Sequence, residues 1–222
     1  MNKQSWLIPL SLLLMSAACS NDGATKLLYQ GHASFRLIAK NGTVIYIDPY
    51  AGEGYDIPAD IILVTHGHRD HNRIDLVTQN KGCVIVTYNE ALSGGKHNTL
   101  NIKGINIEAV EASNANHNPS VCVGYIITID GVRLYHAGDT SRTGQMESFA
   151  GKNLDYALLP CDGIYNMNAE DAAQCAAVIG AKHNVPMHTN PSKLFDREIA
   201  ERFNAPNRLI IESAEEIELS RL

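Results

Sequence analysis

The sequence has a single tryptophan, no Cys-x-x-Cys pair, no dense cluster of basic residues and no apolar run of 20 residues. Without a cysteine pair, a thiolate zinc finger is excluded. We do not expect nucleic acid as a partner, because phosphate neutralisation needs a basic face, and the 18 Lys and Arg residues are dispersed in a chain of net charge −6. The apolar fraction of 45% in 222 residues is still enough for one well-packed domain.

The first 18 residues are typical of a secretory signal. A basic residue, Lys3, precedes an apolar run at 6–15 and the small residues Ser-Ala-Ala at 16–18. The run is too short for a permanent membrane span, which needs about 20 residues. Cys19 follows directly and resembles the lipidated cysteine of bacterial lipoproteins, so we expect a lipid anchor in the bacterial cell envelope. Ser20, rather than aspartate, favours the outer membrane; an ordinary cleaved signal is the alternative.

Residues 19–25 are then expected to form a polar tether, and residues 26–222 a single domain. The remaining cysteines lie in apolar strand-like runs or in an Ala-rich helical stretch. Although an oxidising compartment would permit disulfides, such contexts favour buried free thiols. These residues are Cys83, Cys122, Cys161 and Cys175.

Hydrophobic patterning predicts an α/β protein in which helices cover a β-sandwich. Asn41-Gly42 and Asp130-Gly131 each separate two strand-like runs, as hairpin turns do. Helices are expected at 72–80, 169–181 and 192–203, with Asn168 capping the second. Strands are expected at 26–29, 35–39, 43–47, 61–65, 83–87, 105–110, 122–129, 132–136, 156–159, 185–188 and 209–212.

The strongest chemical signal follows the apolar run at 61–64, where residues 65–71 read Thr-His-Gly-His-Arg-Asp-His. In an extended segment His66 and His68 point the same way, so they can bind one ion together. As the chain turns, Asp70 and His71 can face a second ion. Imidazole and carboxylate ligands suit zinc, and also manganese or iron.

This segment belongs to an ordered set of motifs. The set comprises Gly-His-Ala-Ser-Phe at 31–35, Ile-Asp-Pro at 47–49, the segment 65–71, His117, Tyr-His-Ala-Gly-Asp-Thr at 135–140, Leu-Pro at 159–160 and Pro-Met-His at 186–188. Over residues 26–212 it resembles the metallo-β-lactamase fold superfamily. Within that superfamily it looks most like the small bacterial metal-dependent hydrolases related to ascorbate-6-phosphate lactonase and N-acylphosphatidylethanolamine phospholipase D. The resemblance implies a four-layer αββα sandwich.

The resemblance also implies a site for two divalent metal ions, with zinc expected and manganese or iron as alternatives. The first ion would be held by His66, His68 and His117, and the second by Asp70, His71 and His188. Asp139, directly after the strand at 132–136, would bridge both. His136 competes with His117 for the first ion, and the turn context of His117 favours it.

Further polar residues are expected around the ions. Asp48 follows a strand and is expected to hydrogen-bond a metal-bound imidazole. His32 and His136 are candidates for the pocket wall or for similar support. Asp162 and Tyr165 lie in a loop that could reach the site. The last two histidines, His97 and His183, are expected at the surface.

These residues predict a hydrolase in which a hydroxide bridging two metal ions attacks an ester, lactone, amide or phosphodiester bond. Asp70 would bind metal and also assist proton transfer. A small molecule or a lipid would be the substrate. An iron-dependent oxidoreductase on the same scaffold and a non-catalytic envelope zinc-binding protein are the alternatives, since ligand type alone barely separates them.

Overall fold

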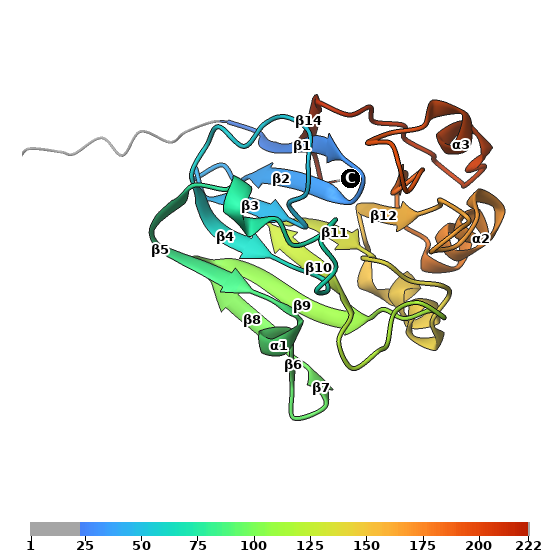
Figure 1. Cartoon of the computed structure of the whole chain (residues 1–222), viewed down its shortest axis with the longest axis horizontal. Coiled ribbons are helices and arrows are strands. Elements are labelled where there is room, and N and C mark those ends of the chain that lie inside the picture. The colour runs from blue at the N-terminus through green and yellow to red at the C-terminus, as the bar shows by residue number, and fades with distance from the viewer. Residues whose placement is uncertain (1–22, 222) are drawn as a thin grey trace, which may run out of the picture.

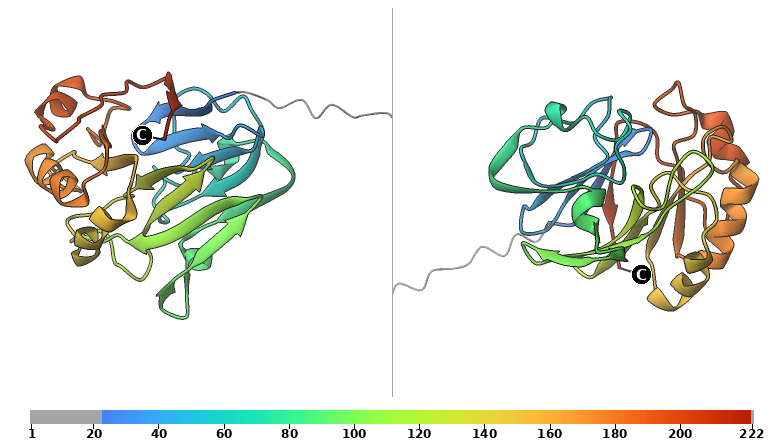
Figure 2. Two further views of the ribbon diagram at one scale, coloured as in Figure 1. Left: turned by 180° about the vertical axis from the view of Figure 1, so that it is seen from behind. Right: turned by 60° about the horizontal axis from the view of Figure 1, so that its bottom comes forward.

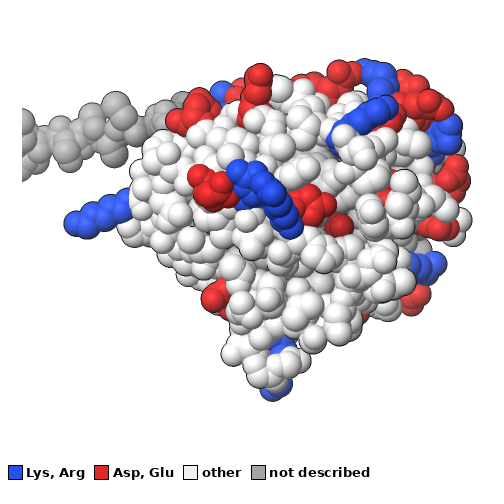
Figure 3. Space-filling model, in the orientation of Figure 1, with Lys and Arg blue, Asp and Glu red and all other residues white. Residues whose placement is uncertain are grey.

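Two six-stranded β-sheets packed face to face form the centre of the protein (Figure 1). The computed structural model describes residues 23–221, so the predicted signal, Cys19 and most of the tether lie outside the described residues. Within those residues, no helix has the length and apolar character needed to cross a membrane. On the face shown in Figure 3, Lys and Arg side chains are scattered singly.

The first sheet has the strand order β14-β1-β2-β3-β4-β5. Its three last strands run parallel, and the other pairings are antiparallel. The Asn41-Gly42 turn joins β2 to β3, as predicted. The strands are β1 (Thr25–Gly31), β2 (Ser34–Ile38), β3 (Val44–Ile47), β4 (Ala59–Leu63), β5 (Gln79–Val86) and β14 (Glu215–Leu219).

The second sheet has the order β13-β12-β11-β10-β9-β8, and β11, β12 and β13 run parallel. Asp130 and Gly131 join β10 to β11 with φ of 50° and 85°, which confirms the predicted tight turn. A small separate hairpin pairs β6 (Leu92–Ser93) with β7 (Lys96–His97). The main strands are β8 (Thr99–Ile102), β9 (Ile105–Glu111), β10 (Val123–Ile129), β11 (Val132–His136), β12 (Tyr156–Pro160) and β13 (His183–Met187).

Helices cover the outer face of the second sheet near β11, β12 and β13 (Figure 2). The longest is α2 (Ala169–Ile179), which packs against β12 and against the 3-10 helix η2 (Gly144–Lys152). The side chain of Asn168 accepts a hydrogen bond from the Asp171 amide at 2.8 Å, so the predicted cap is present. The shorter helices are α1 (Tyr88–Ala91), α3 (Arg197–Arg202) and the 3-10 turn η1 (Ile74–Leu76).

Strand β4 shows how the core is built. Ile61 and Leu63 face the space between the sheets, and Ile62 and Val64 pack on the outer face, so all four are buried. A parallel strand that is buried on both faces reads as a continuous apolar run. The predicted α/β sandwich is thereby confirmed, and β4 ends where the histidine segment begins.

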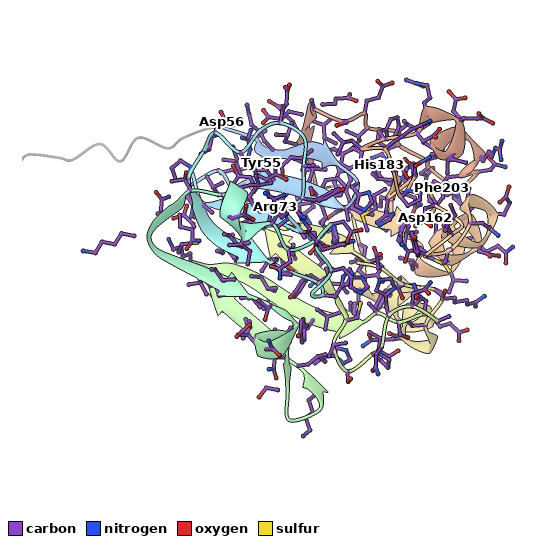
Figure 4. The ribbon with its side chains drawn as sticks, viewed as in Figure 1. Tyr55, Asp56, Arg73, Asp162, His183 and Phe203 are labelled. Atoms are coloured by element: carbon purple, nitrogen blue, oxygen red, sulfur yellow. The ribbon has the colours of Figure 1, made fainter. Side chains whose placement is uncertain are left out.

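The predicted helix at 72–80 is wrong. Only η1 forms there, and β5 already begins at Gln79. The loop at 48–58 covers the outer face of the first sheet instead, with Tyr55 stacked on Tyr46 at a ring-centroid distance of 5.6 Å (Figure 4). Because this loop already buries the apolar face, no long helix is needed there.

The C-terminal region also differs from the sequence expectation. The helix expected at 192–203 is limited to α3, and the strand expected at 209–212 is wrong. The strand forms later, as β14, where it pairs antiparallel with β1. All four cysteines among residues 23–221 are free; Cys122, Cys161 and Cys175 are buried and Cys83 is half-buried.

Candidate metal centre

The candidate site lies where the carboxyl ends of strands from both sheets meet. Asp48 follows β3 and His66 follows β4, and these two strands are parallel neighbours in the first sheet. In the second sheet, Asp139, Asp162 and His188 follow β11, β12 and β13, which are also parallel neighbours. Parallel strands end at a common edge, so residues distant in sequence converge there.

The first cluster comprises His66, His68 and His117, whose ring nitrogens lie within 4.8 Å of one another. His66 Nε2 is 3.1 Å from His68 Nδ1. His117 Nδ1 is 2.8 Å from the side-chain oxygen of Asn114, which leaves its Nε2 for the cluster. These are the three residues that the sequence predicts for the first ion. Asn114 was missed, and its only sequence signal was its place in the same turn.

The second cluster contains Asp70, His71 and His188, as predicted, and His32 in addition. His32 Nε2 is 3.1 Å from Asp70 Oδ2, and its ring lies 3.6 Å from the ring of His188. The amide of His188 donates to the carbonyl of His32 at 2.7 Å. The backbone and side chains of the two residues are therefore held together, and His32 lies within the cluster, where it contacts Asp70.

The carboxylate of Asp139 lies between the two clusters. Its oxygens are 3.3 Å from His71 Nε2, 3.4 Å from His117 Nε2 and 3.5 Å from His188 Nε2. Gly138, with φ of 63°, makes this position accessible, because a Cβ there would lie 2.7 Å from the carbonyl oxygen of Val123. Asp139 thus lies between the two clusters, where a carboxylate bridging two ions is expected from the sequence.

Several polar atoms at this point are buried without a hydrogen-bond partner in the described chain. They are the Nε2 atoms of His71, His117 and His188 and the Oδ1 atom of Asp139. Buried polar atoms are rarely left unpaired, because each costs about 1–3 kcal/mol. Nitrogen lone pairs and a carboxylate that converge on one space fit a divalent cation such as zinc. The donor set therefore fits the metal ions that the sequence predicts.

Carboxylates hold the outer nitrogens of two of these histidines. Asp48 Oδ2 lies 2.7 Å from His71 Nδ1 and accepts the hydroxyl of Thr65 at 2.7 Å, and its Oδ1 accepts the Thr65 amide at 2.7 Å. Asp162 Oδ2 lies 3.0 Å from His188 Nδ1. An N–H donated outward leaves the opposite nitrogen free to bind metal. Asp48 therefore has the contact predicted for it, whereas Thr65 was not recognised from the sequence.

His136 is not part of either cluster. Its Nε2 donates to the carbonyl of Ala33 at 2.9 Å, and its Nδ1 accepts the amide of Gly138 at 3.2 Å. Both ring nitrogens are thus used by the backbone in a fully buried position. His97 and His183 lie away from the clusters, half-buried at the ends of β7 and β13.

The electrostatic surroundings shift the pKa values of His66 and His71 in opposite directions. Burial and the nearby charge of His71 lower the pKa of His66 to about 3, so His66 is neutral and its lone pair is available. Burial also tends to lower the pKa of His71, but the carboxylates of Asp139 and Asp48 outweigh it and raise that pKa well above its ordinary value. Burial alone would raise the pKa of Asp139, yet the neighbouring histidines hold it well below its usual range.

A cavity of about 900 Å³ opens over the clusters. Asp162 itself is not at its wall, but Tyr165 from the same loop is, with 52% of its surface exposed. The site residues at the wall are His68, Asp70, His117 and Asp139, and the outer wall includes Tyr50, Arg69, Arg73, Asn116 and Pro191. The candidate ligands at this wall are therefore reachable by a small molecule.

Comparison with known families agrees with this geometry. The family model described as a β-lactamase superfamily domain matches residues 26–188. The chain belongs to the metallo-β-lactamase superfamily. A UPF0173 metal-dependent hydrolase of Methanosphaera stadtmanae is 31% identical over 196 residues, which are 74% of this chain and 84% of that protein. Another, from Thermococcus kodakarensis, is 31% identical over 224 residues, covering 87% of this chain and 99% of that protein.

Solved structures share the fold. Igni18, a metallo hydrolase from Ignicoccus hospitalis, superposes with a TM-score of 0.70 at 24% identity, over 89% of this chain and 99% of that one. CmlA, a diiron β-hydroxylase from Streptomyces venezuelae, has a TM-score of 0.64 at 12% identity, over 88% of this chain and 54% of that one. The fold thus accommodates both hydrolases and an oxidoreductase.

Proposed function

We propose that this metal-dependent hydrolase uses two divalent metal ions, most readily zinc, to cleave an ester, lactone, amide or phosphodiester bond. His66, His68 and His117 would hold one ion. Asp70, His71 and His188 would hold the other, with Asp139 shared between them. The observation that carries the proposal is the convergence of unpaired buried histidine nitrogens on the carboxylate of Asp139.

When bound, two neighbouring divalent ions lower the pKa of a water molecule and polarise the bond to be cleaved. The chain itself orients the groups around that water. Asp70 is 37% exposed at the cavity wall, and His32 holds its carboxylate at 3.1 Å. Burial would raise the pKa of Asp70, but the hydrogen bond from His32 and the charge of His71 lower it, so the carboxylate is ionised at neutral pH. Asp70 is then able to accept a proton from the attacking water.

The same ligands also serve iron, and the fold of CmlA supports keeping an iron-dependent oxidoreductase as the second candidate. A non-catalytic zinc-binding protein would have no use for a cavity of about 900 Å³ beside the ligands. Hydrolase relatives at 31% identity favour hydrolysis over both alternatives.

Metal analysis tests the dinuclear centre. Protein purified without added metal should carry close to two ions per chain, and Asp139→Asn should lower that content because it removes the shared negative charge. The control is Asp171→Asn, an exposed carboxylate in the first turn of α2. Wild-type protein with one ion or none would contradict the proposal.

Activity is tested by screening aryl esters, lactones, bis-aryl phosphodiesters and β-lactams. We expect one class to be cleaved and Asp70→Ala to reduce kcat by at least about 100-fold, as loss of a proton-transfer group does. Full activity in Asp70→Ala would refute the role given to Asp70. Oxygen consumption by iron-loaded protein, without hydrolysis of any class, would support the oxidoreductase instead.

We further propose that Cys19 is lipidated and tethers the domain to the bacterial outer membrane. Thr25, at the start of β1, donates its hydroxyl to Asp130 in the β10–β11 turn at 2.7 Å. That turn lies at the opposite end of β11 from Asp139, so a tether there leaves the cavity open. Cell fractionation should find the protein with membranes, and Cys19→Ser should abolish acylation; an unmodified Cys19 in the wild-type protein would contradict this proposal.

A further inference from the structure

The cavity over the metal clusters has a basic wall that the ligand set does not explain. Arg69 lies between His68 and Asp70, is exposed, and lines this cavity. Its guanidinium makes no hydrogen bond or ion pair within residues 23–221. Arginine left without a partner next to a binding site retains all five N–H donors for a ligand.

Arg73 lines the same cavity and is held in place. Its Nε and Nη2 donate to the two carboxylate oxygens of Asp75, each at 2.8 Å, and its amide donates to the carbonyl of Pro49 at 2.7 Å. These contacts fix the guanidinium while leaving Nη1 unused in the described chain. In Figure 4, Arg73 and Asp162 lie on opposite sides of the site, Arg73 on the side of the first sheet and Asp162 on the side of α2.

The charge of the cavity wall depends on whether metal ions are bound. Its only carboxylates among the described residues are Asp70 and Asp139, and both belong to the proposed ligand set. Once those two are neutralised by cations, the guanidinium of Arg69 remains without an ion pair in the described chain, and that of Arg73, which is paired with Asp75, still has Nη1 for a ligand. The net charge of −6 disfavours anions at long range, but a local positive field inside a cleft outweighs it at contact distance.

Part of the remaining wall is apolar and aromatic. Tyr50, Pro191 and the half-exposed Tyr165 line the cavity, and Ile164 beside Tyr165 is 65% exposed. Exposed large apolar side chains often form part of a binding surface. An apolar body and an anionic group could therefore both be accommodated.

We infer that the substrate carries a carboxylate or phosphate group, separate from the bond that is cleaved, which binds to Arg69 and Arg73. Guanidinium groups bind both anions through paired hydrogen bonds, so the two anions share one chemistry. The apolar part of the substrate lies against Tyr165 and Tyr50. This inference rests on the proposed function, because it names the substrate class of the same site.

Binding to the metal-loaded protein tests the anion site in the state in which Asp70 and Asp139 are neutralised. Glutarate and phenyl phosphate are titrated calorimetrically into zinc-loaded wild type, Arg69→Gln, and the control Arg142→Gln, whose side chain pairs with Glu147. We expect Arg69→Gln to weaken binding of at least one anion about 10-fold, since a charge-assisted contact is lost, and Arg142→Gln to bind as wild type does. The anion that binds more tightly identifies the group. Absence of binding, or equal binding by all three proteins, overturns the inference.

Turnover of a matched pair separates this inference from the proposed function. The mono-p-nitrophenyl ester of glutaric acid and its methyl ester differ in the distant charge and by one methyl group, and the uncatalysed rate of each is subtracted. We expect wild type to prefer the anionic ester, and Arg69→Gln to raise KM for that ester about 10-fold while the neutral ester is unaffected. Hydrolysis of both without preference overturns the anion site and leaves the hydrolase intact. Arg69-dependent anion binding with no hydrolysis of any tested class supports the anion site and counts against the hydrolase.

Discussion

Asp48 offers the sharpest test of how the metal centre is built. Its buried carboxylate holds His71 and Thr65 through three contacts of 2.7 Å. In Asp48→Asn, an NH2 group in place of Oδ2 would face the Thr65 hydroxyl and His71 Nδ1, which are both donors. About two charge-assisted hydrogen bonds are therefore lost. At about 1.5–3 kcal/mol each, and with a buried ion pair broken, unfolding of the metal-free protein should become easier by about 3–5 kcal/mol.

The same substitution should weaken metal binding. Without the carboxylate, His71 loses the group that fixes its tautomer and directs its Nε2 toward Asp139. Loss of such an outer contact typically costs 10–100-fold in metal affinity. Competition with a chelating dye measures the affinity, and chemical denaturation of the metal-free form measures the stability separately.

Asp56→Asn is the matched control, because Asp56 is a carboxylate with 74% of its side chain exposed, paired with Arg36. A surface pair contributes at most about 1 kcal/mol, and no effect on metal binding is expected. If Asp48→Asn behaves like Asp56→Asn in both assays, the account of Asp48 as the group that holds His71 is refuted.

Three further predictions follow from the same geometry. His117→Gln should lower metal content whereas His136→Gln should not, because both nitrogens of His136 serve the backbone; equal losses would show that His136 is a ligand. Gly138→Ala should destabilise the protein by at least about 2 kcal/mol more than Gly42→Ala, since a Cβ at Gly138 meets a carbonyl at 2.7 Å and one at Gly42 meets nothing within 4 Å; denaturation curves that coincide would contradict this. Below pH 6.5 the metal-free protein should lose stability, because the unfolded chain protonates His66, whose pKa in the fold is lowered by burial to about 3. In His66→Asn, the slope of the free energy of unfolding against pH should be smaller by about 1.4 kcal/mol per pH unit, as measured by denaturation between pH 4 and 6.5.

The convergence of the predicted ligand candidates could largely be anticipated because these residues are placed by local signals. The histidine segment follows an apolar run that can only be a buried strand, and Asp139 follows Gly138, whose φ of 63° few other residues adopt. The partners that orient the histidines were harder to predict from the sequence. Thr65 and Asn114 are common turn residues, and only their three-dimensional position gives them a role.

The errors in the fold have a common physical origin. Residues 72–80 have a helix-like pattern, but the loop carrying Tyr55 covers the apolar surface against which such a helix would pack. β14 is mostly acidic and reads poorly as a strand, yet its backbone completes the edge of the first sheet beside β1. In both places contacts between residues distant in sequence determine the structure, and local propensity does not predict such contacts.

The pairing of β1 with β14 also affects when the protein can fold. Thr25 pairs with Leu219, so the edge of the first sheet depends on the two most distant parts of the described chain. Such non-local pairing makes folding slow, because the entropy of closing a long loop is lost before the contact forms. During synthesis, residues up to Leu219 must leave the ribosome before this edge can close. A delay of that kind would keep the polypeptide unfolded for longer, which suits a chain whose N-terminal signal we propose directs its export.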